Sequence, residues 1–303
     1  MISEEMKNVI VQGKKFQARL LKWLNPATVN VQKWRQAEDL TSNIESMPND
    51  AKWQQINANG VITELITTPH ASKKHIIYYI HGGSYIAGSV SRSRPSLGRW
   101  SKMLNVSAFS VEYRLAPEYP FPAGLEDCLR AYRWLITTGG VKPGNIIFFG
   151  SSAGGGLTLA TLVKLRDAGD LMPIAVVLQS PWLDLSLSGN SVKLKATEDP
   201  ILNVVLLKFA AKCYYGENDP RKPLISPLFS DIRDLPPLFI QAGTAEILLD
   251  DSVRLAELAK KVGVDVELEI WEGMPHSFIG LNISIPEVQK GRSQIADFMK
   301  KYF

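Results

Sequence analysis

Short apolar runs alternate with amphipathic segments through most of this chain. One run, at 61–67, alternates apolar and polar positions, and five others are nearly continuous: 75–80, 106–111, 145–149, 174–178 and 238–242. The last run covers 264–271. Continuous runs of this length are typical of strands that are covered on both faces, as in a parallel sheet. The intervening segments with helical spacing cover 126–137, 155–168 and 251–262. The pattern therefore predicts an α/β layered protein with right-handed crossovers.

Two segments depart from this alternation. Residues 1–50 are predicted to form amphipathic helices, broken at Pro26, with an apolar face made by Val9, Phe16, Leu20, Leu21 and Trp23. Residues 185–223 show no clean strand and a helical stretch at 201–215. A helical insertion of this kind sits where lids are found. We expect both segments to form one cap on a core made of 51–184 and 224–303.

The candidate nucleophile is Ser152, at the centre of Gly150-Ser151-Ser152-Ala153-Gly154. The motif follows a predicted strand and precedes a predicted helix, which is the context that makes G-x-S-x-G informative. The tight turn needs glycine on both sides, and the helix N-terminus favours a developing oxyanion. Ser151 lies one residue off the centre and is expected to point elsewhere. The motif predicts a serine hydrolase.

A serine hydroxyl needs a positioned base, and in hydrolases built on this turn the order is serine, acid, histidine. Of the four histidines, only His276 follows Ser152; the others are His70, His75 and His81. The acid is expected after the strand 238–242, where three carboxylates are candidates: Glu246, Asp250 and Asp251. Asp251 begins a predicted helix, and its alternative role is to cap that helix or to favour its dipole. Glu246 lies nearest the strand end and is favoured, with Asp250 as the main alternative.

The oxyanion hole is predicted in the loop His81-Gly82-Gly83-Ser84, directly after the strand 75–80. Glycines there let backbone N–H groups approach a substrate oxygen. We expect the N–H groups of Gly82, Gly83 and Ala153 to form the hole.

Composition and charge bear on the partners, cofactors and cellular location that the sequence predicts. The 303 residues are 45% hydrophobic with a formal charge of +4 and no long run of like charge, so a nucleic-acid partner is not expected. No clustered His/Cys set or phosphate-binding glycine loop is present, so neither a metal nor a cofactor is predicted. Cys128 and Cys213 form no C-x-x-C pair and are expected to be free thiols. With no secretory signal and no apolar stretch of about 20 residues, we expect a soluble, cytoplasmic protein without a membrane span.

Several motifs in the same order resemble the hormone-sensitive-lipase-like carboxylesterases of the α/β-hydrolase superfamily. They are His81-Gly82-Gly83, the stretch 112–118 (EYRLAPE), Phe121-Pro122-Ala123, Glu126-Asp127, Ser152-Ala153-Gly154-Gly155 and Gly273-Met274-Pro275-His276. The resemblance runs from about residue 53 to the C-terminus. It implies an α/β-hydrolase fold with an eight-stranded, mostly parallel sheet flanked by helices, and a helical cap from the N-terminus and an insertion after the sixth strand.

Three positions depart from the family pattern. Ser84 stands where a third glycine is usual, and Ser151 stands where aspartate is common. Glu246, before Ile247-Leu248, stands where the family usually has an aspartate before Pro-Leu. The resemblance therefore favours Glu246 over Asp250 as the acid.

The resulting hypothesis is hydrolysis of short-to-medium acyl esters through an acyl-enzyme on Ser152. Apolar cap residues such as Phe16, Trp23 and Leu206 either shape the pocket or pack on the core. Amide, carbamate or lactone hydrolysis with the same triad, or non-catalytic binding of a small molecule on this fold, are the alternatives. The resemblance also suggests a homodimer, for which residues 266–271 would be available as an edge strand.

Overall fold

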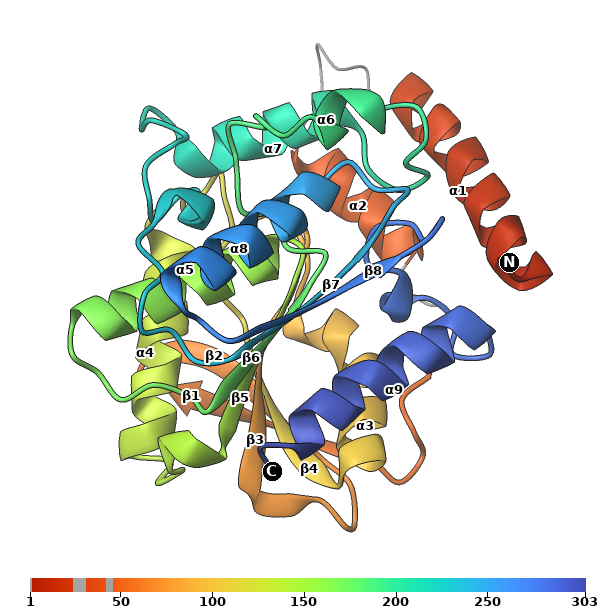
Figure 1. Ribbon diagram of the computed structural model, residues 1–303. Coiled ribbons are helices and arrows are strands. Elements are labelled where there is room, and N and C mark those ends of the chain that lie inside the picture. Colours follow the sequence, from red (N-terminus) through yellow and green to blue (C-terminus); the bar gives the residue numbers. More distant parts are fainter. Residues whose placement is uncertain (1, 24–30, 42–45) are drawn as a thin grey trace.

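The structure, a computed structural model, describes residues 2–23, 31–41 and 46–303, without the side chains of 20–23 and 37–41. In these ranges eight strands form one sheet in the order β1-β2-β4-β3-β5-β6-β7-β8 (Figure 1). The strands are β1 Lys52–Ala58, β2 Val61–Thr67, β3 Ser72–Ile80, β4 Val106–Val111, β5 Ile146–Ser151, β6 Ala175–Gln179, β7 Leu238–Gly243 and β8 Val266–Trp271. Strand β2 runs antiparallel to both neighbours, and the other pairings are parallel. The predicted mostly parallel α/β sheet is confirmed.

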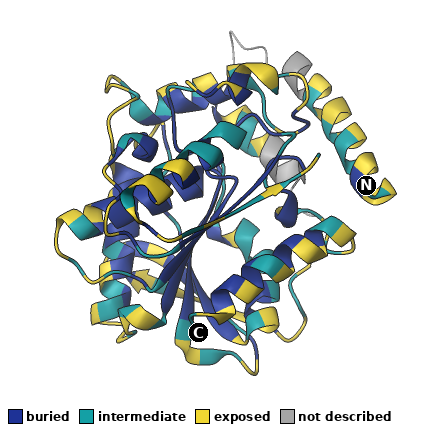
Figure 2. Cartoon of the chain, in the orientation of Figure 1, coloured by how far each residue is buried: buried dark blue, intermediate teal, exposed yellow. Residues whose placement is uncertain are grey.

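Helices cover both faces of this sheet. They are α1 Glu4–Trp23, α2 Val31–Thr41, α3 Val90–Leu104, α4 Ala123–Thr137, α5 Ala153–Asp167, α6 Ser191–Leu194, α7 Val204–Tyr215, α8 Leu249–Val262 and α9 Pro286–Lys300. Residues of α3 and α9 pack with one side of the strands, and residues of α4, α5 and α8 pack with the other. Figure 2 shows the central strands in the dark blue of buried residues and the outward faces of the helices in yellow and teal. The runs that form β4, β5, β6 and β7 are buried at every residue, as their continuity predicts, whereas β8 at the edge of the sheet is only partly buried.

The apolar pattern does not reveal three elements that the structure contains. Strand β1 is largely exposed and has no apolar run, but it pairs with β2 across a hairpin at Asn59-Gly60, whose φ angles are +55° and +88°. An Asn-Gly pair favours the tight two-residue turn of a β-hairpin. Helix α3 is rich in serine and arginine, contains Pro95, and begins at the cap Ser89, whose side chain accepts from the N–H of Arg92. Helix α9 is the third.

The two segments of the predicted cap lie against each other. The Gln17 side chain of α1 donates to the carbonyl of Leu202, and Gly13 lies so close to Pro200 that a Cβ there would be 2.9 Å from its carbonyl oxygen. In Figure 1, α1, α6 and α7 line the upper edge of the molecule. The predicted apolar residues Leu20, Leu21, Trp23 and Pro26 lie outside the part whose side chains are described.

Two features concern association with a second copy of the chain and with a membrane. Strand β8 is an outer strand of the sheet, as the suggested pairing requires, and the homodimer itself stays a prediction. Within the described ranges, no helix combines the length and the apolar character that crossing a bilayer requires.

Candidate active site

Ser152 occupies a strained turn between β5 and α5. Its φ and ψ are +53° and −122°, a conformation that costs a non-glycine residue on the order of 1–3 kcal/mol. The flanking glycines make the turn possible. A Cβ at Gly150 would lie 2.3 Å from the Thr158 hydroxyl, and one at Gly154 would lie 2.1 Å from the carbonyl of Ile80. The turn places the Ser152 side chain at the N-terminus of α5, where the helix dipole favours negative charge.

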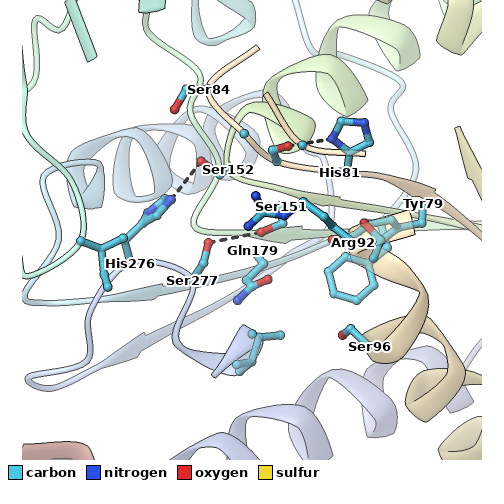
Figure 3. Close-up of a pocket in the computed structure, with 18 of the residues that line it drawn as sticks. Tyr79, His81, Ser84, Arg92, Ser96, Ser151, Ser152, Gln179, His276 and Ser277 are labelled. Carbon is cyan, nitrogen blue, oxygen red and sulfur yellow. Dashed lines mark hydrogen bonds between the residues drawn. The ribbon is translucent and has the colours of Figure 1, made fainter. Parts of the chain in front are cut away.

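The structure brings Ser152, His276 and Glu246 into one hydrogen-bonded line. The Nε2 atom of His276 lies 2.9 Å from Ser152 Oγ, and its Nδ1 atom lies 2.7 Å from Glu246 Oε2. Figure 3 shows the imidazole of His276 directed at Ser152. Glu246 is fully buried and His276 is 6% exposed, so bulk water does not compete for these contacts. Ser151 points elsewhere, as predicted, with its hydroxyl 3.2 Å from that of Ser277 (Figure 3).

Further hydrogen bonds hold the Glu246 carboxylate in place. Its Oε1 atom accepts from the Gly243 N–H at 2.6 Å and from the Ser180 hydroxyl at 3.0 Å. The Ser180 oxygen in turn accepts from the N–H of Ser277, next to the histidine. Ser180 was not predicted from the sequence, although its position directly after β6 is a usable signal. One serine thereby joins the acid loop to the histidine loop.

The other two candidate acids bind elsewhere. Asp250 accepts from the N–H of Ser191 at 3.0 Å. Asp251 lies in the first turn of α8 but does not cap it, because its carboxylate accepts from the N–H groups of Leu183 and Asp184. Burial raises its pKa to about 8. The geometry therefore favours Glu246.

The predicted oxyanion loop lies beside Ser152. A Cβ on Gly82 would be 3.3 Å from the Cβ of Ser152, and Gly83 has a φ of +119°. Burial lowers the pKa of His81 to about 4, so its ring is neutral near pH 7 and donates from Nδ1 to the Gly82 carbonyl at 2.7 Å. Ala153, the third predicted donor, is the first residue of α5. Ser84 has a φ of +55°, which explains the family's glycine there; keeping serine costs roughly 1 kcal/mol.

A cavity of about 320 Å³ opens onto the nucleophile. Ile201 and Leu202 line it from the insertion, and Trp100 and Phe149 line it from the core. Its polar lining comes from α3, the strand ends and the histidine loop: Tyr79, Ser89, Arg92, Ser93, Ser96, Ser151, Gln179 and Ser277. Of the cap residues for which both roles were open, Phe16 and Leu206 do not line the cavity: Phe16 is 43% exposed, and Leu206 is buried outside the lining. The side chain of Trp23 lies outside the described part.

Over the described residues, histidine, cysteine and carboxylate side chains do not form a group of three or more that could hold a metal ion. Cys128 and Cys213 are free thiols, as predicted. The chemistry that the site offers is that of a serine with a paired base.

Comparisons with known proteins agree with this geometry. The model of the α/β hydrolase fold family matches residues 77–280. An esterase of Acinetobacter venetianus is 35% identical over 229 residues, which are 75% of this chain and 75% of that relative. A crystal structure of an esterase from the bacterial hormone-sensitive lipase family is 36% identical with a TM-score of 0.92, covering 100% of this chain and 99% of that one. A crystal structure of EstE5 soaked with p-nitrophenyl butyrate is 36% identical with a TM-score of 0.85, covering 91% and 92%.

The sheet, the serine turn and the hydrogen-bonded line of Ser152, His276 and Glu246 are those of a serine hydrolase. The chain belongs to the α/β-hydrolase fold family. Within it, the chain is an esterase of the hormone-sensitive-lipase type, so the resemblance seen in the sequence is confirmed. The alternative of a non-catalytic binder is not retained.

Proposed function

We propose that this esterase hydrolyses short-to-medium acyl esters through an acyl-enzyme formed on Ser152. The observation that carries the proposal is the hydrogen-bonded line from Ser152 Oγ through the His276 imidazole to Glu246, at 2.9 and 2.7 Å. Both distances are already within the range that proton transfer requires.

In the acylation step, Ser152 Oγ attacks the ester carbonyl carbon while His276 Nε2 takes the hydroxyl proton. The imidazolium then gives that proton to the departing alcohol, which leaves an acyl-Ser152 ester. Glu246 accepts the Nδ1–H hydrogen bond throughout and so holds the ring in the tautomer that leaves Nε2 basic. In deacylation a water molecule attacks the acyl carbon while the same imidazole takes its proton. The bond between the acyl carbon and Ser152 Oγ then breaks, the carboxylic acid leaves, and the imidazolium returns the proton to Ser152 Oγ.

We assign the oxyanion hole to the N–H groups of Gly82, Gly83 and Ala153. Gly82 and Gly83 line the cavity with Ser152, and Ala153 follows the nucleophile at the helix N-terminus. Donors fixed in advance at the place where negative charge develops stabilise the tetrahedral intermediate without reorganisation. The neutral His81 ring holds the first carbonyl of this loop and so keeps the two glycines in place.

The size of the cavity supports small substrates. Its volume of about 320 Å³ is at the lower end of the 300–1,000 Å³ that ligand pockets usually span. EstE5, a relative of known structure, was soaked with an ester of a four-carbon acid. Residues 1–50 and 185–223 act as the cap in this proposal, because Ile201 and Leu202 line the cavity and Gln17 of α1 binds the same segment.

The test is turnover of p-nitrophenyl acetate, butyrate and octanoate by the wild type and by Ser152→Ala. We expect the wild type to favour acetate and butyrate, and Ser152→Ala to lose at least about 10³-fold in kcat. A fluorophosphonate probe should label the wild type and Ser151→Ala but not Ser152→Ala. Full turnover by Ser152→Ala would overturn the assignment, and faster cleavage of phenyl acetamide than of the esters would favour an amidase.

A further inference from the structure

A second buried carboxylate lies beside the triad, and the hydrolytic steps do not use it. Asp199 belongs to the insertion between β6 and β7 and is only 1% exposed. Burying a charge is costly unless hydrogen bonds replace the water that it loses. Asp199 has three such bonds, all from backbone N–H groups: Ile201 at 2.8 Å, Leu202 at 2.9 Å and Ile247 at 2.8 Å.

The two carboxylate oxygens of Asp199 bind two different parts of the site. Oδ1 accepts from the N–H groups of Ile201 and Leu202, the two residues of the insertion that line the substrate cavity. Oδ2 accepts from the N–H of Ile247, the residue directly after Glu246. One rigid group therefore joins the cavity wall to the loop that carries the triad acid.

The bond to Ile247 is the part that local structure does not require. An aspartate that binds the N–H groups two and three residues later is a common turn or helix-start arrangement, and Oδ1 alone satisfies it. Oδ2 reaches across 48 residues of sequence to the acid loop. A residue needed only for its own turn has no reason to make that contact while buried.

The charge of Asp199 also acts near the base. Burial raises the pKa of Asp199 to about 6, and that rise is opposed by the charge that His276 carries when protonated and by the three N–H groups. At neutral pH the carboxylate is therefore mostly ionised.

We propose that Asp199 is a positioning residue that couples the substrate-facing wall of the insertion, Ile201 and Leu202, to the acid Glu246 through the N–H of Ile247. The proposal rests on the proposed function, because it assigns Asp199 an effect on the same triad. It assigns each oxygen a separate effect: Oδ2 supports kcat through the acid loop, and Oδ1 supports substrate fit through the wall.

The two effects are separated by Asp199→Asn and Asp199→Ala. The amide oxygen of asparagine can still accept from Ile201 and Leu202, but its NH₂ group then faces the N–H of Ile247, two donors without an acceptor. We expect Asp199→Asn to lower kcat about tenfold with KM changed less than about twofold. Asp199→Ala removes both links, so the kcat/KM ratio of p-nitrophenyl hexanoate to acetate should also change by more than about threefold.

The matched control is Asp250→Asn. Asp250 also joins the insertion to the segment after β7, through the N–H of Ser191, but Ser191 does not line the cavity. All rates are expressed per Ser152 titrated with a fluorophosphonate, which removes losses that come from unfolded protein. We expect Asp250→Asn to match the wild type in kcat and KM.

A double-mutant cycle decides whether Asp199 acts through Glu246. In a Glu246→Gln background the effect of Asp199→Asn on kcat should shrink to less than about twofold. Wild-type kcat and KM per titrated site in Asp199→Asn, or an undiminished effect in the Glu246→Gln background, would overturn the proposal. If Asp199→Asn gives too little titratable enzyme, Asp199→Ser takes its place, because the serine hydroxyl still accepts one N–H. The same fall in kcat in the wild-type background, and its loss in the Glu246→Gln background, are then expected. Failure of the proposed function would look different, because the wild type itself would neither cleave esters nor bind the probe.

Discussion

At the scale of single residues, the site depends on which side chain each catalytic group binds through a hydrogen bond. Glu246 and Asp250 are four positions apart and chemically similar, yet only Glu246 contacts His276, at 2.7 Å. Asp250 is turned toward the N–H of Ser191. The direction in which each side chain points therefore decides which carboxylate is the triad acid, and the acidity of the two groups does not.

Replacing Glu246 by glutamine should lower kcat by about 10²–10⁴-fold. The amide cannot stabilise the imidazolium and can hold the ring in the wrong tautomer. The measurement is kcat for p-nitrophenyl butyrate per titrated Ser152, with Asp250→Asn as the control. Loss of activity in Asp250→Asn together with an active Glu246→Gln would assign the acid to Asp250 instead.

At the scale of elements, the decisive contact is between the serine turn and the end of β3. Gly154 packs so tightly there that an added Cβ would lie 2.1 Å from the carbonyl of Ile80 and 2.5 Å from that of His81. Strand β3 leads directly into the loop with Gly82 and Gly83. The spacing of nucleophile and oxyanion donors is therefore set by this glycine contact.

Gly154→Ala should push the two elements apart, with a loss of more than about 10²-fold in kcat, because misplaced oxyanion donors cost that much. A lower melting temperature should accompany it. Gly144→Ala is the control, because no atom lies within 4 Å of a Cβ added there. Normal turnover by Gly154→Ala would mean that this contact can relax and does not set the donor spacing.

At the scale of the whole molecule, Asp251 links α8 to the chain that leaves β6. Its carboxylate is buried and accepts from the N–H groups of Leu183 and Asp184. Burial raises its pKa to about 8 from an ordinary value of 3.8. Between these values the folded protein holds a proton that the unfolded chain releases, so rising pH lowers the free energy of unfolding, by up to about 1.4 kcal/mol per pH unit.

Asp251→Asn should remove this contribution, because an amide oxygen can accept the same two N–H groups without titrating. The measurement is urea unfolding at pH 5.5, 6.5 and 7.5. We expect the difference in unfolding free energy, variant minus wild type, to grow with pH. A difference that stays constant over this range would show that Asp251 does not change its protonation there.

The sequence predicted those features whose signals lie in neighbouring residues or in the order of residues along the chain. The strand runs, the serine turn and the single histidine after Ser152 are local or depend on order alone, and the structure brings the predicted Ser152, His276 and Glu246 together. Strand β1 and helices α3 and α9 were missed. Strand β1 is largely exposed, and α3 is polar apart from a stripe that includes Leu97 and Trp100, so neither shows a strong apolar pattern.

The sequence alone determined seven of the eight strands, the nucleophile and the order in which acid and base follow it, because burial periodicity and turn chemistry depend on neighbouring residues. Only the tertiary structure decided that Glu246 reaches His276 while Asp250 does not. The tertiary structure also brought the Ser180 hydroxyl to the Glu246 carboxylate and the Asp199 carboxylate to the N–H of Ile247. These contacts join loops that are tens of residues apart, and their direction depends on how the whole sheet places the loop ends.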